Sequence, residues 1–135
     1  MICQYLSTES GDTATGFPEQ LYFSYQKVTS LRYGENPHQR GAWYRPLYHD
    51  ALPIEQLHGK EISFNNLLDI TASLNIIGET EGVAAAVIKH TNPAGIAEAS
   101  RLSVAIERAL DSDIQSAFGG IVIVSRAMDK KASAV

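Results

Sequence analysis

The apolar run VAAAVIK at residues 83–89 constrains the fold of this chain more than any other segment. It has the length of a strand, and its lack of polar alternation is typical of a strand covered on both faces. HTNPAG follows as a predicted turn, because Asn-Pro and Gly favour turns. An amphipathic helix comes next, and GIVIVS (120–125) is a second buried strand. Strand, helix and strand predict a parallel, right-handed βαβ unit over 83–125, and thus an α/β fold.

Further elements are expected from the spacing of apolar residues. A helix over 66–77 is indicated by Leu67, Ile70, Leu74 and Ile77. The helix inside the βαβ unit is marked by Leu102, Ala105, Ile106, Ala109 and Leu110. LYFSYQKV (21–28) and GAWYR (41–45) predict two short strands, and MDKKASAV is expected to start another helix.

The composition bounds the class of protein. With 135 residues, 44% of them apolar and 19% charged, the chain fits one soluble globular domain. A net charge of −4 argues against broad nucleic-acid binding, and the single Cys3 excludes an internal disulfide. No apolar run reaches the roughly 18 residues of a membrane span, and MICQYLSTES lacks the basic start of a signal peptide. We therefore expect a cytoplasmic protein without nucleic-acid or membrane partners.

Lys89 and His90 stand at the carboxyl end of the first buried strand, where open parallel sheets bind their ligands. Imidazole can accept a proton near neutral pH, and an adjacent ammonium keeps it available as a base. The ammonium of Lys89 can also stabilise an oxyanion that develops on an acyl carbon. Alternatively, both side chains lie at the end of a strand and have no catalytic role. Both interpretations stay open at this point.

Arg32 and Tyr33 lie in a predicted loop and would suit a nucleoside monophosphate. The guanidinium matches a phosphate, and the phenol ring offers a flat face to a heteroaromatic base. On their own, a surface arginine beside a half-buried tyrosine is the better interpretation. Asn66 can bind a ligand, although an ordinary N-cap role is favoured. Gly119 in SAFGG can expose backbone N–H groups to a ligand, or simply form a tight turn.

Several known chemistries have no supporting motif. The sequence contains neither the H-x-E and C-x-x-C pair of zinc deaminases nor a G-x-x-x-x-G-K-[ST] phosphate loop. A G-x-S-x-G nucleophile elbow is also missing. No metal site is therefore expected.

Four segments resemble one known family in order and spacing. They are KVTSLRYGENPHQ (27–39), ISFNNLLD (62–69), IKHTNPAGIA (88–97) and SAFGGIV (116–122). Together they make the chain similar to the bifunctional AICAR transformylase/IMP cyclohydrolase family, in its bacterial branch. The resemblance runs from about residue 17 to the end, with Ala94 where many members have Cys.

The resemblance implies formyl transfer from 10-formyltetrahydrofolate to the 5-amino group of AICAR, giving FAICAR in purine biosynthesis. It implies His90 as the base and Lys89 as its helper. AICAR would be held by Arg32 and Tyr33, with a backbone contact at Gly119 and a supporting contact at Asn66. The implied fold is the three-layer cytidine-deaminase-like α/β fold, used without zinc.

The resemblance also sets expectations for the limits of the chain. Residues 1–16 would be a linker or the remnant of a preceding helix, and residues 17–135 the first part of the transformylase domain. The main folate-binding residues would lie outside the chain, and the intact enzyme would be a homodimer. The alternative is a non-catalytic nucleotide-binding or dimerising remnant that holds only part of the AICAR site.

Overall fold

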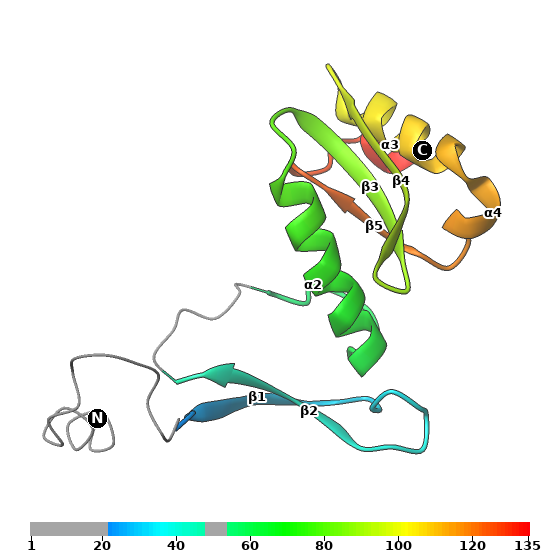
Figure 1. Cartoon of the computed structure of the whole chain (residues 1–135). Coiled ribbons are helices and arrows are strands. Elements are labelled where there is room, and N and C mark those ends of the chain that lie inside the picture. Colours follow the sequence, from blue (N-terminus) through cyan, green and yellow to red (C-terminus); the bar gives the residue numbers. More distant parts are fainter. Residues whose placement is uncertain (1–21, 48–53) are drawn as a thin grey trace, which may run out of the picture. The chain divides into compact units, whose positions relative to one another are not determined.

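The computed structural model describes residues 22–47 and 54–135 (Figure 1). The chain forms two compact units. The first consists of Met1–Ser30 and Ala42–Gly59, and the second of Leu31–Gly41 and Lys60–Val135. The expected linker at residues 1–16 lies outside the described residues.

A two-stranded sheet dominates the first unit. Its strands are β1 (Tyr25–Leu31) and β2 (Gly41–Pro46), joined at their ends by a 2.9 Å bond from the Leu47 N–H to the Ser24 carbonyl. The predicted strand at 41–45 is confirmed. The strand predicted at 21–28 begins later, because residues 22–24 precede the first ladder residue. Most described side chains of this sheet are exposed, so alternation was a weak guide to where the strand begins.

A three-stranded sheet forms the centre of the second unit. The central strand is β3 (Val83–Lys89), flanked by β4 (Asn92–Ala99) and β5 (Ile121–Val124). Both neighbours run antiparallel to β3. The strand predicted at 83–89 is therefore confirmed with its bounds unchanged.

The predicted parallel pairing within 83–125 is wrong for β3 and β5. Their register, with Ala85 opposite Val124 and Ile88 opposite Ile121, is antiparallel. The cause is β4, whose first residues belong to the HTNPAG segment that predicted a turn because it contains Asn-Pro and Gly. β4 accommodates Pro93 beside a bulge, where the register shifts by one residue. Since β4 and β5 are both antiparallel to β3, they are parallel to each other, and α3 (Leu102–Ser112) connects them across the central strand.

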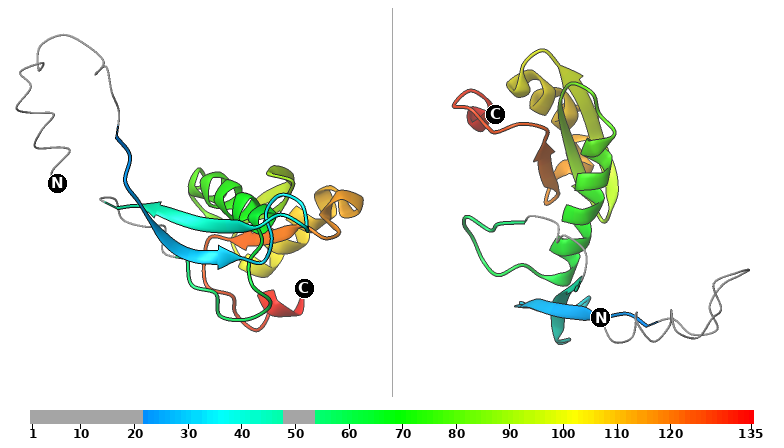
Figure 2. Two further views of the ribbon diagram at one scale, coloured as in Figure 1. Left: turned by 90° about the horizontal axis from the view of Figure 1, so that it is seen from below. Right: turned by 90° about the vertical axis from the view of Figure 1, so that its left-hand side faces the viewer.

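Helices cover both faces of this sheet (Figure 2). α3 contacts β3 and β4, while α2 (Phe64–Gly78) contacts β3 and β5. Ala85 and Val87 pack with α3 in the main hydrophobic cluster, and the alternate residues of β3 point to the opposite face. The residues of β3 from Ala84 to Ile88 are all fully buried. A mixed α/β unit with three layers is thus observed.

The helices differ in how well the apolar pattern predicted them. In α3, Leu102, Ala105, Ile106 and Ala109 are buried as expected. In α2, Leu74 is 36% exposed, and the buried residue is Ser73, whose hydroxyl donates to the Asp69 carbonyl at 2.6 Å. α2 also begins two residues before the predicted start. A short α4 (Ile114–Ala117) precedes β5, and the helix predicted near the end is a 3₁₀ turn, η1 (Ala132–Ala134).

Candidate active site

Lys89 and His90 occupy the tight turn of the β3–β4 hairpin (Figure 1). Lys89 pairs with Asn92, so His90 and Thr91 are the two central turn residues. Their φ angles are 52° and 64°, and positive values at both positions are what a type I′ turn requires. Asn-Gly is the usual pair in such a turn, whereas a β-branched residue with positive φ is a true outlier. The candidate base therefore lies on strained backbone at an exposed turn.

Three hydrogen bonds fix this turn. The Asp69 carboxylate of α2 accepts from the Thr91 N–H at 2.8 Å. The His90 carbonyl accepts from the Thr91 hydroxyl at 2.6 Å and from the Asn92 side-chain amide at 2.9 Å. The first of these bonds joins the turn to a separate element, and the other two are internal to the turn.

Lys89 reaches the Phe118–Gly119 segment. Its ammonium donates to the Phe118 carbonyl at 2.9 Å. Gly119 has a φ of 77°, a conformation that glycine adopts at little cost. Gly120 is equally constrained, because a Cβ there would lie 2.9 Å from the Ile88 carbonyl oxygen. The two glycines let this loop pass close to the end of β3.

The charge of Lys89 also affects Asp113. The pKa of Asp113 is lowered mainly by the Ser116 hydroxyl and backbone N–H, and least by the positive charge of Lys89. The same carboxylate caps α4 by accepting from the Ser116 N–H at 3.0 Å.

Arg32 and Tyr33 lie against the start of α2. Their backbones bond to the segment before the helix, through Arg32 N–H to the Ile62 carbonyl at 3.0 Å and Phe64 N–H to the Tyr33 carbonyl at 3.1 Å. The guanidinium donates to the Tyr33 hydroxyl at 3.0 Å, and its carbon lies 4.7 Å from the ring centroid. The pKa of Tyr33 is lowered, first by the Arg32 side chain and then by the Ser63 hydroxyl. The two side chains are thus held as one group.

Asn66 takes part in capping, as its residue type suggested, but from inside the helix. Ser63 is the N-cap, and Asn66 is the third helical residue. The Asn66 side-chain oxygen accepts from the Ser63 hydroxyl at 2.8 Å and from the Ser63 N–H at 3.2 Å. In return, the Ser63 hydroxyl accepts from the Asn66 N–H at 3.2 Å. This reciprocal pair is a capping box in which Asn replaces the usual Glu or Gln.

The six residues predicted from the sequence lie along or next to one series of residue contacts within the second unit. Tyr33 contacts Ser63, which bonds to Asn66. Three residues further along the same helix face, Asp69 holds the turn that carries His90, and Lys89 in turn reaches the carbonyl preceding Gly119. Sequence reasoning missed Ser63 and Asp69 as participants. The Ser-x-x-Asn spacing could have indicated Ser63, whereas the contact of Asp69 is with a turn 22 residues away.

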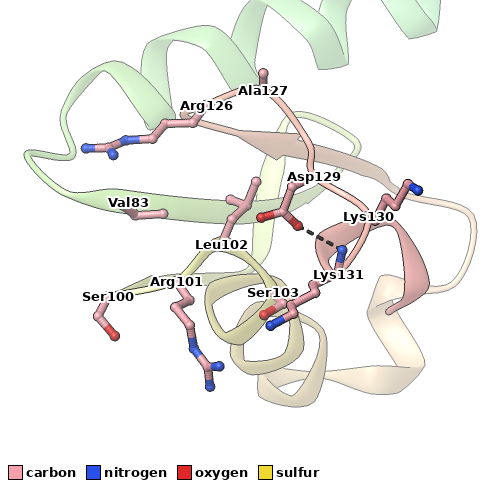
Figure 3. A pocket seen from close by; sticks show the side chains of 10 residues that line it. All are labelled: Val83, Ser100, Arg101, Leu102, Ser103, Arg126, Ala127, Asp129, Lys130 and Lys131. Atoms are coloured by element: carbon pink, nitrogen blue, oxygen red, sulfur yellow. Dashed lines mark hydrogen bonds between the residues drawn. The ribbon is translucent and has the colours of Figure 1, made fainter.

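A cavity of about 640 Å³ lies at the other end of β3, where Val83 begins the strand (Figure 3). None of the predicted site residues lines it. Arg126 and Lys130 extend in opposite directions from its wall, and Asp129 accepts from the Lys131 N–H at 2.9 Å. The cavity is therefore separate from the Lys-His turn.

Within the described part of the chain, no three His, Cys, Asp or Glu side chains form a group that could hold a metal ion. No helix within residues 22–47 and 54–135 is long and apolar enough to cross a membrane.

The mixed α/β unit agrees with the α/β class expected from the sequence. All 135 residues match the AICARFT/IMPCHase bienzyme family. The chain belongs to this family.

Curated relatives carry the name bifunctional purine biosynthesis protein PurH. The relative from Thermoanaerobacter sp. (strain X514) is 46% identical over 117 residues, which cover 85% of this chain and 23% of the relative. The relative from Leuconostoc mesenteroides is 44% identical over 132 residues, which cover 96% of this chain and 25% of the relative. The relative from Bacillus subtilis (strain 168) is 40% identical over 133 residues, with the same coverage. The chain thus spans about a quarter of the length of these relatives.

Proposed function

We propose that this chain supplies the AICAR-binding side of a formyl-transfer site in purine biosynthesis. The formyl donor is 10-formyltetrahydrofolate, and the acceptor is the 5-amino group of AICAR. The amine nitrogen bonds to the formyl carbon while the bond from that carbon to N10 of the folate breaks. The amine loses a proton, N10 gains one, and the products are FAICAR and tetrahydrofolate.

The observation that carries the proposal is the turn that holds His90 between Lys89 and the Asp69–Thr91 bond. His90 is exposed at this turn, so its imidazole can reach a substrate from solvent. The amine of AICAR is a weak nucleophile because it is conjugated with the ring and the carboxamide. Removal of its proton by His90 in the transition state, directly or through the substrate's own carboxamide, is the help that this reaction needs. Such proton transfer contributes roughly 10²–10⁴-fold in rate.

Lys89 would stabilise the negative charge that develops on the formyl oxygen. An ammonium carries three donor hydrogens, so the bond to the Phe118 carbonyl leaves others for a substrate. Placed beside the formyl group, Lys89 would stabilise the oxyanion that forms as the amine attacks. Gly119, directly after Phe118, would contribute a backbone contact with AICAR.

Arg32 and Tyr33 would hold the ribonucleotide. The guanidinium already lies over the Tyr33 ring, so its remaining N–H donors are pre-oriented for a phosphate or a carboxamide oxygen. Asn66 would support the same ligand through its amide nitrogen, since its oxygen serves the capping box. We further propose the cytidine-deaminase-like fold for the intact domain and a homodimer for the intact enzyme.

A second candidate function is nucleotide binding without catalysis. It is favoured by one observation: the chain spans about a quarter of the length of its relatives, and the residues assigned here contact AICAR and the formyl group but no other part of the folate. Both candidates share the AICAR contacts, and they differ only in turnover.

Calorimetry with AICAR and a formyl-transfer assay with 10-formyltetrahydrofolate separate the two candidates. Turnover by the 135-residue chain would establish the transferase and exclude the binding-only candidate. AICAR binding without turnover would support the second candidate for this chain. No AICAR binding by the folded chain would contradict both.

A further inference from the structure

The turn that carries His90 has an unfavourable backbone conformation. Both central residues have positive φ, and neither is Gly or Asn. Left-handed backbone is unfavourable for a residue with a Cβ, and more so for β-branched Thr91. A two-residue turn with these side chains therefore persists only where neighbouring groups stabilise it.

Asp69 is the group outside the hairpin that does this. Its Oδ1 accepts from the Thr91 N–H at 2.8 Å, the donor that follows His90 in the chain. Asp69 is half-buried in the second turn of α2, and its backbone carbonyl accepts from the buried Ser73 hydroxyl. The acceptor is therefore mounted on a helix that packs on β3 and β5. Among the described residues, the other bonds of His90 and Thr91 end within the turn itself, while Lys89 at the start of the turn bonds to the Phe118 carbonyl.

We propose that Asp69 is a positioning residue for His90. Its carboxylate fixes the Thr91 N–H, holds both central residues in the left-handed conformation and so directs the imidazole to the AICAR amine. The inference rests on the proposed function for the role of His90 in catalysis, but the hold of Asp69 on the turn can be measured without it. A bond to a carboxylate is stronger than one to a neutral acceptor, which suits it to this strained site.

The test on the 135-residue chain compares Asp69→Ala, Asp69→Asn and Asp69→Ala with Thr91→Gly by NMR. In Asp69→Ala, the Thr91 amide should lose about tenfold or more of its protection against hydrogen exchange. The strong intraresidue Hα–HN NOE of His90, which reports positive φ, should weaken. Asp69→Asn keeps an acceptor at the same place and should retain the turn. In the double variant, glycine tolerates the left-handed conformation, so the His90 NOE should return.

The control is Asn75→Ala, an exposed residue on the same helix, which should leave Thr91 unchanged. Protection of the β3 amides, such as those of Ala86 and Val87, should stay the same in every variant, which separates a local effect from global unfolding. The proposal is overturned if Asp69→Ala keeps both the Thr91 protection and the His90 NOE. It is also overturned if Asp69→Asn loses as much as Asp69→Ala.

The catalytic consequence is tested in a full-length protein that carries this sequence. Asp69→Ala should lower kcat about tenfold or more, with KM for AICAR within about threefold, and adding Thr91→Gly should recover part of kcat. Equal losses in Asp69→Asn and Asp69→Ala would contradict the positioning role. If the unmodified protein transfers no formyl group, the proposed function fails, whereas the NMR result still decides whether Asp69 holds the turn.

Discussion

The ammonium of Lys89 donates a 2.9 Å hydrogen bond to the carbonyl oxygen of Phe118, 29 residues further along the chain. This bond joins the hairpin turn of the candidate site to the loop that leads into β5. Two motifs that are distant in sequence, Lys-His and Phe-Gly-Gly, are therefore in contact.

His90→Ala should abolish formyl transfer in a full-length protein carrying this sequence and leave AICAR affinity nearly unchanged. The reason is that His90 is proposed to accept a proton in the transition state and does not anchor the nucleotide. Steady-state kinetics and calorimetry with AICAR measure the two effects. A kcat that survives within a few fold would remove His90 from the role of base.

Arg32→Ala should weaken AICAR binding by roughly 1.5–3 kcal/mol, the range for hydrogen bonds to charged groups. Calorimetry on the 135-residue chain is the measurement. Arg40→Ala is a matched control, because Arg40 is an exposed arginine of the same loop. Equal affinity in the unmodified chain and in Arg32→Ala would show that the guanidinium does not hold the ligand.

The pKa of Tyr33 should rise towards its ordinary value when Arg32 is replaced by Ala, because the guanidinium is the largest cause of the lowering. Ser63→Ala should raise the pKa by less. Ultraviolet titration of tyrosinate, with Tyr33→Phe to assign the signal, measures both shifts. A pKa of Tyr33 that stays lowered in Arg32→Ala would assign the effect to another group.

The sign of the linked stability follows from the lowered pKa of Tyr33. The contribution of Tyr33 ionisation to the free energy of unfolding is fully present above the pKa of the unfolded chain, near pH 10. It is lost as the pH falls through the lower pKa of the folded state. At neutral pH it contributes nothing, so the loss of this linkage in Arg32→Ala should alter stability only in the alkaline range.

Ser63→Ala should destabilise the folded state by about 0.5–2 kcal/mol, the range for loss of an N-cap side chain. Ser63 is 1% exposed and exchanges bonds with Asn66, so we expect the upper part of this range. Urea denaturation followed by circular dichroism gives the difference. Ser133→Ala, an exposed serine near the end of the chain, should change stability little. A loss of similar size in both variants would contradict the capping box.

Gly95→Ala should destabilise the second unit by about 1–3 kcal/mol, the usual cost of overpacking. Gly95 is buried in β4, and an added Cβ would overlap the Ala109 carbonyl oxygen and the Ser112 Cβ of α3. The same denaturation experiment measures it. Gly78→Ala is the control, since a Cβ there meets no described atom within 4 Å. If both alanines are tolerated equally, β4 and α3 do not approach as closely as the structure has them.

Much of the second unit could be predicted from apolar pattern. β3 and α3 were predicted because each buries a large share of its residues, and burial is what the pattern reports. β4 was missed because its first residues include Pro93 and Gly95, and because Ile96 and Glu98 are both exposed. Without β4, the direction of β5 relative to β3 was wrong. Whether β5 runs parallel or antiparallel to β3 depends on whether another strand lies between them in the chain. No local sequence pattern shows this.

The candidate site was predicted residue by residue from motifs, but its connections were not. Arg32 with Tyr33 and Lys89 with His90 are sequence neighbours, so their proximity was assured. The bonds from Asp69 to Thr91 and from Lys89 to Phe118 join residues 22 and 29 positions apart. They exist because α2 and β5 pack on β3, and such contacts follow from tertiary structure alone.

The central place of β3 has a consequence for the order in which the site assembles. β3 and β4 are joined by a two-residue turn, so their pairing closes a very short loop. The chain between β3 and β5 includes β4, α3 and α4. The pairing of β5 with β3 therefore closes a much longer loop, at a higher entropic cost. We therefore expect the hairpin with His90 to form early, and the bond from Lys89 to Phe118 to form when β5 docks. Refolding experiments that follow Phe118 would report the last step in completing this site.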